Sequence, residues 1–132
     1  MISVNLLPRK EFEILYEGKT ISGKFGTWSA KRFGQIKKMS LMQLWDRASK
    51  DLTYDDIILN ILCAIEYYSV KYARPFTYTD VDVCEWIDAM GGVDSTTFQN
   101  LCLHAKSELP EIEEKKTLLS GGISNGQLTQ AV

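Results

Sequence analysis

The sequence predicts a mostly helical α+β fold, in which a short N-terminal β-hairpin packs on a bundle of four to five helices. Two runs rich in β-branched and aromatic residues, 12–16 (FEILY) and 20–25 (TISGKF), flank a turn that contains Gly18, which is typical of a hairpin. After this hairpin, apolar residues recur at helical spacing between residues that cap helices and residues that end them. The apolar fraction of 45% and the charged fraction of 24% are ordinary for a folded domain with a real core.

The length of 132 residues is enough for one domain with tails. We expect an N-terminal arm over 1–10, a single globular domain over 11–109 and a mobile C-terminal tail over 110–132. The tail is expected because Pro110 cannot continue a helix, and because a charged run and then many Gly, Ser, Asn and Gln residues follow. No stretch approaches the roughly 18 apolar residues of a membrane span, and the N-terminus lacks the pattern of a secretory signal. These observations predict a soluble cytosolic protein.

Two helices are expected directly after the hairpin. The spacing over Thr27–Lys38 predicts a helix with Phe33 and Ile36 on one side. Ser40 can then cap a second helix that runs to about Ser49. The second helix is expected to bury Leu41, Leu44 and Trp45, and the first to carry an outer polar row of Lys31, Gln35 and Lys38.

The strongest helical pattern begins at Thr53, which forms a capping box with Asp56. We expect this helix to run to about Arg74 and to stop before Pro75. Apolar residues cover most of its circumference, so it belongs at the centre of the domain. Glu66 falls inside the apolar arc and needs a charged or hydrogen-bonding partner if buried. A structural role for this carboxylate is favoured over a functional one.

The stretch FTYTDVDVCEWIDAMGG over 76–92 predicts a further helix from Thr79 to Met90. Thr79 caps its start, and Gly91-Gly92 ends it in the position where left-handed residues close helices. Ser95 can cap a last helix to about Ser107. The last helix is expected to bury Phe98, Leu101 and Cys102, with Leu103 as a further candidate. The helix before it should turn Val83, Cys84, Trp86, Ile87 and Met90 inward and an acidic row of Asp82, Glu85 and Asp88 outward.

Residues that could bind a metal or carry catalysis do not converge in this pattern. The acids form an outward row, whereas a hard cation needs several oxygens around one point. Three widely spaced cysteines and one histidine fit neither a disulfide framework nor a zinc site, and we expect buried, reduced thiols. A nucleophilic pair of Cys84 and His104 is not expected, because the two lie on separate helices with the thiol in the core. The sequence therefore predicts a non-enzymatic protein with no catalytic residues, metal or cofactor.

Charge is distributed unevenly along the chain. Residues 1–40 carry eight basic and three acidic residues, for a net charge of +5, and residues 41–132 carry seven and fourteen, for −7. This asymmetry could support head-to-tail association or an electropositive contact face, or could merely reflect where the solvated surfaces fell. Nucleic-acid binding is a weaker alternative, because the nearby aromatic residues Phe25, Trp28 and Phe33 have a spacing that suits a core. Its candidate cations are Lys24, Lys31, Arg32, Lys37 and Lys38.

Three stretches in this order resemble the tail assembly chaperones of long-tailed bacteriophages and prophages. They are EILYEGKTISGKFGTWSAKRFG, DLTYDDIILNILCAIEYYSVK and PFTYTDVDVCEWIDAMGG, and the resemblance spans roughly residues 11–92. The last stretch is the most specific, because it combines an aromatic-Thr pair, a row of acids, Cys-Glu-Trp and a closing Gly-Gly.

The resemblance implies a non-enzymatic, mostly α-helical protein of the host bacterial cytoplasm that is absent from the mature virion. Members of that family bind the tape measure protein and help the tail tube protein polymerise around it, and many are also made in a longer, frameshifted form. The family offers no catalytic residues to carry over. Self-association is a further candidate property, and we take Lys31, Lys38, Asp82, Glu85 and Asp88 as candidate partner-binding residues, with the basic and acidic rows meeting between subunits. The alternative is a small nucleic-acid-binding regulatory protein that uses the basic N-terminal helix.

Overall fold

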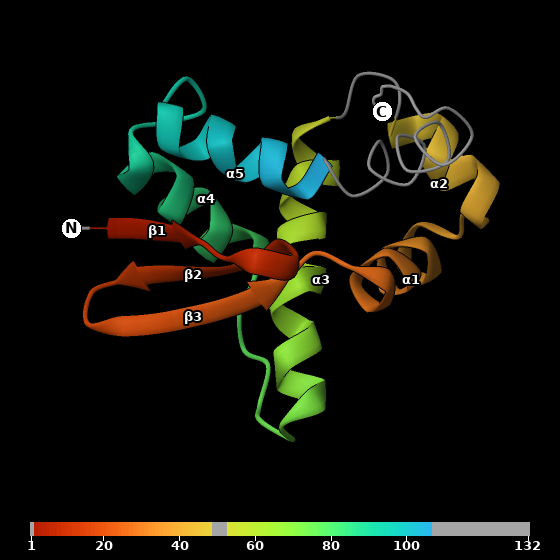
Figure 1. Cartoon of the computed structure of the whole chain (residues 1–132), viewed down its shortest axis with the longest axis horizontal. Coiled ribbons are helices and arrows are strands. Elements are labelled where there is room, and N and C mark those ends of the chain that lie inside the picture. Colours follow the sequence, from red (N-terminus) through yellow and green to blue (C-terminus); the bar gives the residue numbers. More distant parts are fainter. Residues whose placement is uncertain (1, 49–52, 107–132) are drawn as a thin grey trace, which may run out of the picture.

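A computed structural model of the chain describes residues 2–48 and 53–106. Across these residues, a three-stranded antiparallel sheet is followed by five α-helices (Figure 1). The predicted α+β fold, mostly α, is therefore confirmed. The predicted C-terminal tail over 110–132 lies outside the described residues.

The sheet has the strand order β1-β2-β3. Strands β2 (Glu11–Tyr16) and β3 (Lys19–Lys24) form the predicted hairpin, with Tyr16 opposite Lys19 in the register. Both residues of its turn have positive φ, 50° at Glu17 and 78° at Gly18, as the right-handed twist of a tight hairpin favours. A third strand was not predicted: β1 (Ile2–Leu6) lies within the expected N-terminal arm and pairs with β2. A 3-10 turn over Pro8–Lys10 joins β1 to the hairpin.

The helices follow the predicted order, with local capping signals at their starts. Thr53 and Thr79 each accept the backbone N–H three residues later and form capping boxes with Asp56 and Asp82. Gly91 ends its helix at φ 114°, a left-handed conformation that glycine adopts without strain. The central helix is shorter than predicted and ends at Lys71, three residues before Arg74. The helices are α1 (Thr27–Lys37), α2 (Leu41–Ala48), α3 (Tyr54–Lys71), α4 (Asp80–Met90) and α5 (Thr96–Lys106).

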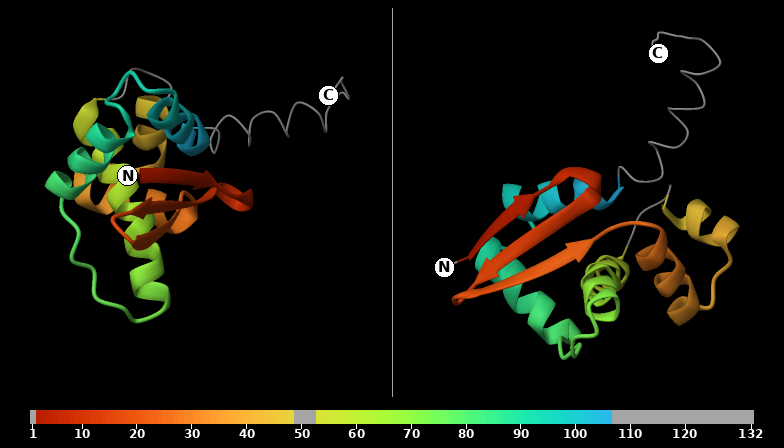
Figure 2. Two further views of the ribbon diagram at one scale, coloured as in Figure 1. Left: turned by 90° about the vertical axis from the view of Figure 1, so that its left-hand side faces the viewer. Right: turned by 60° about the horizontal axis from the view of Figure 1, so that its bottom comes forward.

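Helix α3 runs behind the sheet, with α4 and α5 on one side of it and α1 and α2 on the other (Figures 1 and 2). The core forms where α3, the inner face of the sheet, α4 and α5 meet. At Gly23 a side chain would clash with the ring of Phe12 on the facing strand, so glycine makes room for this ring. The buried apolar residues of this cluster are Phe12, Ile14, Ile21, Phe25, Ile61, Ala64, Ile65, Val83, Trp86, Ile87, Phe98 and Leu101.

Four predictions of burial are wrong. Leu103, a candidate for burial on the last helix, is 62% exposed on α5. Leu41 and Trp45 of α2 are 57% and 37% exposed, because α2 leaves its apolar side uncovered by the rest of the described chain. Cys84 is exposed as well, because the buried face of α4 is narrower than predicted and consists of Val83, Trp86 and Ile87. The other two thiols are less accessible: burial raises the pKa of Cys63 to about 12 and also raises the pKa of the half-buried Cys102.

Candidate interaction surfaces

The predicted basic row consists of Lys31 on the exposed side of α1 and Lys38 directly after its end. Lys31 and Lys38 are both exposed. Lys38 follows the helix in a left-handed conformation, with φ 58° and ψ 49°, and its N–H donates to the carbonyl oxygen of Gly34. The outward position of this row is therefore confirmed, whereas its role in binding stays a prediction.

The two other cations of α1 form ion pairs within the molecule. Arg32 donates from Nε to Oε1 of Glu66 over 3.0 Å, and Lys37 Nζ lies 3.3 Å from Oδ1 of Asp56. Glu66 is half-buried and thus has the charged partner that its position required. Both acids belong to α3, so these pairs tie α1 to the central helix. They also use two of the cations that nucleic-acid binding by α1 would need.

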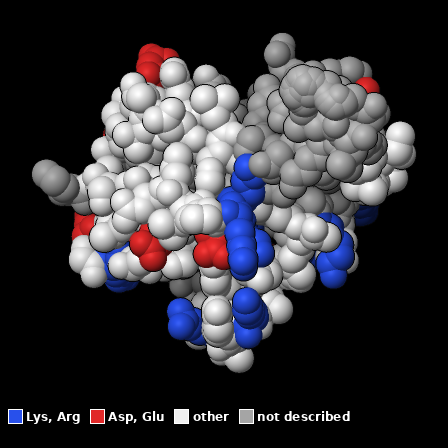
Figure 3. Space-filling view, in the orientation of Figure 1, with Lys and Arg blue, Asp and Glu red and all other residues white. Residues whose placement is uncertain are grey.

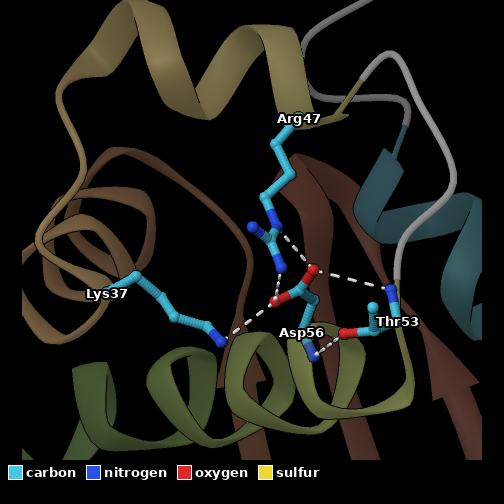
Figure 4. A network of polar contacts seen from close by, with 4 residues as sticks. All are labelled: Lys37, Arg47, Thr53 and Asp56. Carbon is cyan, nitrogen blue, oxygen red and sulfur yellow. Dashed lines mark hydrogen bonds and ion pairs between the residues drawn. The ribbon is translucent and has the colours of Figure 1, made fainter.

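Asp56 is the centre of a polar network that joins three helices (Figure 4). Its side chain is 1% exposed and accepts two hydrogen bonds from Arg47 of α2, Nε to Oδ2 at 2.7 Å and Nη2 to Oδ1 at 3.1 Å. The N–H of Thr53 donates to the same carboxylate over 3.5 Å. We call Lys37, Arg47, Thr53 and Asp56 the Asp56 network.

The electrostatics of the Asp56 network favour the ionised carboxylate. Burial by itself would raise the pKa of Asp56, but hydrogen bonds from Arg47, Lys37 and the Thr53 N–H outweigh it, and the pKa lies below its ordinary value. The paired forked hydrogen bonds from a guanidinium also fix geometry. The network therefore holds α2 against the start of α3.

Helix α2 presents an apolar face to solvent. Leu41, Met42 and Trp45 are 57%, 69% and 37% exposed and lie on one side of the helix at spacings of one and three residues. Ser40 caps this helix: its Oγ accepts the N–H of Gln43 over 3.2 Å. Lys38 of the basic row lies three residues before the helix in the sequence. Several exposed apolar side chains on one side of a helix are typical of a protein-binding surface.

The predicted acidic row lies on α4, but its members differ. Asp82 is half-buried and accepts the N–H of Thr79 at Oδ2 over 2.8 Å, so it serves the helix cap. Glu85 and Asp88 are exposed, and their role in binding stays a prediction. Glu17 of the hairpin turn, burial and Glu85 together raise the pKa of Tyr16.

The two rows face different sides of the molecule. Helix α1 packs on one side of α3 and α4 packs on the other (Figure 2). The ion pairs among residues 2–48 and 53–106 join neither Lys31 nor Lys38 to the acidic row. The structure thus does not bring the five predicted residues together, and a contact between the rows requires two copies of the chain.

Sequence reasoning missed Arg47 and the apolar face of α2. Arg47 carried no local signal, because its partner Asp56 lies nine residues away across the start of another helix. Asp56 was predicted as part of a helix cap only. The apolar pattern of α2 was visible, but periodicity does not tell whether another element covers an apolar face.

Within residues 2–48 and 53–106, no group of three or more His, Cys, Asp or Glu side chains could hold a metal ion. No helix of this part of the chain combines the length and the apolar composition of a membrane span. No family model matches the chain, and comparisons with curated proteins and with solved structures find no significant similarity. The sequence and the surfaces described above are therefore the features that bear on function.

Proposed function

We propose that the protein is a phage or prophage tail assembly chaperone, which binds the tape measure protein and promotes assembly of the tail tube without enzymatic activity. The resemblance of the sequence to this family supports the proposal. The three stretches that carry the resemblance lie in β2 to α1, in α3 and in α4, which pack on one another around the central helix. The proposal places the protein in the host bacterial cytoplasm and outside the mature virion.

The exposed apolar face of α2 is the observation that carries this proposal furthest. A chaperone of a long helical client needs an exposed apolar surface that accepts an amphipathic helix. Leu41, Met42 and Trp45 supply such a surface, and Met and Trp adapt well to varied apolar side chains. The Asp56 network holds this helix to the domain, so the face is presented by a fixed element.

The alternative, a nucleic-acid-binding regulator that uses α1, has less support. Arg32 and Lys37 form ion pairs with α3, which leaves Lys31 and Lys38 as the exposed cations of this helix region. Binding of the full chain to generic DNA duplex, with a steep loss of affinity as salt rises, would favour this alternative.

Coexpression with the tape measure protein encoded beside it tests the proposal directly. A client of this kind aggregates when made alone, and we expect it to become soluble and to copurify with the chain. Recovery of the same amount of soluble client with and without the chain would contradict the proposal. An unrelated aggregation-prone helical protein serves as the control, and its solubility should not change.

A further inference from the structure

The C-terminal end of α3 projects past the sheet and carries cations that lie over tyrosine rings (Figure 1). Lys24 Nζ and Lys71 Nζ each lie 5.6 Å from the ring centroid of Tyr67. Lys71 Nζ also lies 5.5 Å from the ring centroid of Tyr72, and Arg74 Cζ lies 5.3 Å from it. We call Lys24, Tyr67, Lys71, Tyr72 and Arg74 the cation–ring surface.

Aromatic packing holds this surface in place. Trp28 packs on Tyr67 with centroids 6.2 Å apart, and Tyr67 packs edge-on against Tyr68 at 5.2 Å. Tyr68 stacks on Tyr72 at 5.9 Å with an angle of 8° between the rings. Ring faces attract cations, so this series of rings orders the three cations without neutralising them.

The cations of this surface keep their charge for a partner. The ion pairs within the described parts of the chain use other cations, namely Arg32, Lys37 and Arg47. Glu11 lies opposite Lys24 in the sheet register; burial and Glu11 raise the pKa of Tyr68 to about 12, and Tyr67, Tyr72 and, more weakly, Glu11 raise the pKa of Lys71. Glu11 is thus the one acid of the described residues that these pKa shifts place beside the cation–ring surface. Figure 3 shows Lys and Arg side chains over the projecting end of α3, and an acidic side chain beside the stripe of Lys and Arg just above it.

The geometry favours carboxylates over nucleic-acid bases as the ligand. Binding of single strands relies on aromatic faces on which bases stack. Here the faces of Tyr67 and Tyr72 already carry cations. An ammonium over a ring still has N–H donors directed outward, so it can pair with a carboxylate.

The chain itself offers a matching acidic surface on another of its sides. Glu85 and Asp88 are exposed on α4, Glu17 is exposed in the hairpin turn, and Glu17 and Glu85 both contribute to raising the pKa of Tyr16. The ion pairs of the described residues include none of these three carboxylates. We infer that the cation–ring surface of one copy binds the Glu85 and Asp88 side of α4 in a second copy, in a head-to-tail contact. This contact joins different surfaces, so it leads to rings or open chains, and it does not depend on the identity of the client.

Sedimentation velocity of the full chain over a concentration series tests this contact. We expect the wild type to associate, and the association to weaken as salt rises. Two double variants, Lys71→Glu/Arg74→Glu and Glu85→Lys/Asp88→Lys, place like charges against each other. We expect each of them to associate at least about tenfold more weakly than the wild type. An equimolar mixture of the two should regain association, which also shows that both variants are folded.

The control variant Lys31→Glu/Lys38→Glu makes the same change of charge on the basic row that was predicted to meet the acidic row between subunits, so it separates that contact from the contact of the cation–ring surface. We expect it to associate like the wild type. Equal weakening in this control, or a mixture that stays monomeric, or a wild type that is monomeric at every concentration, would each overturn the inference. Binding of labelled oligothymidylate that is lost in Lys71→Glu/Arg74→Glu, without self-association of the wild type, would reassign the surface to nucleic acid.

Discussion

The two ends of α3 use their cations in opposite ways. At the N-terminal end, Arg47 and Lys37 pair with the buried carboxylate of Asp56 and tie α2 and α1 to the central helix. At the C-terminal end, Lys71 and Arg74 lie over tyrosine rings and remain exposed. A cation paired with a buried carboxylate stabilises the fold, whereas a cation held on a ring keeps its charge for another molecule. Substitutions at the two ends should therefore affect different properties.

The largest loss of stability is expected from Asp56→Asn. The variant keeps a capping oxygen but removes the charge that Arg47 and Lys37 share, and we expect the free energy of unfolding to fall by about 2 kcal/mol. Urea denaturation followed by circular dichroism measures it. Asp55→Asn is the matched control, because Asp55 lies in the same first turn but is exposed, and it should stay within about 0.5 kcal/mol of the wild type. Equal values for the two variants would show that the network does not hold the helices.

Protonation of Asp56 at acid pH should remove the stabilisation that its ion pairs with Arg47 and Lys37 provide. The pKa of Asp56 is lowered in the folded chain, so folding is favoured by its ionised form. This stabilisation is fully present above the unfolded pKa of about 4 and is lost as pH falls through the lower folded pKa. We expect the difference in unfolding free energy between wild type and Asp56→Asn to be constant near neutral pH and to shrink below about pH 4. A difference in unfolding free energy that grows as the pH falls would contradict the predicted direction.

A smaller effect is expected from Glu66→Ala at the middle of α3. The pair with Arg32 is partly exposed, with side-chain exposures of 22% and 38%, so water screens it. We expect a loss below about 1 kcal/mol in the same urea denaturation. A loss as large as that of Asp56→Asn would show that the exposure of an ion pair does not set its contribution.

The smallest effect on folding is expected at the C-terminal end of α3. The double variant Lys71→Glu/Arg74→Glu should leave the urea midpoint close to that of the wild type, because both side chains are exposed. Its self-association should nevertheless weaken, as sedimentation measures. A large fall in the urea midpoint would assign these cations to the fold instead of to a partner.

Local signals explain what the sequence predicted well. The capping boxes of Thr53 and Thr79 and the left-handed Gly91 involve residues within four positions of each other, so they are legible without the fold. The need of Glu66 for a partner was also legible, although Arg32 lies 34 residues earlier and its identity was not.

Contacts between distant residues explain what the sequence could not predict. Strand β1 forms because β2 offers an edge for pairing, and five residues carry too little pattern to reveal this. Periodicity placed the apolar side of α2 and Cys84 of α4 on faces that were expected to be buried. Whether such a face is buried depends on whether another helix or strand packs against it, and both are exposed in the structure. The cation–ring surface joins Lys24 of β3 to residues more than 40 positions later, so it appears only in the folded chain.

The solubility of the tape measure protein, coexpressed with variants of the apolar α2 face, tests the proposed function most directly. Leu41→Gln/Met42→Gln should lower the amount of soluble client severalfold, because it removes two exposed apolar contacts while the Asp56 network stays intact. Leu103→Gln is the matched control, since Leu103 is an exposed leucine, 62% exposed, on α5. We predict wild-type amounts of soluble client with Leu103→Gln and a severalfold loss with the α2 variant. Equal amounts of soluble client with both variants would contradict the account.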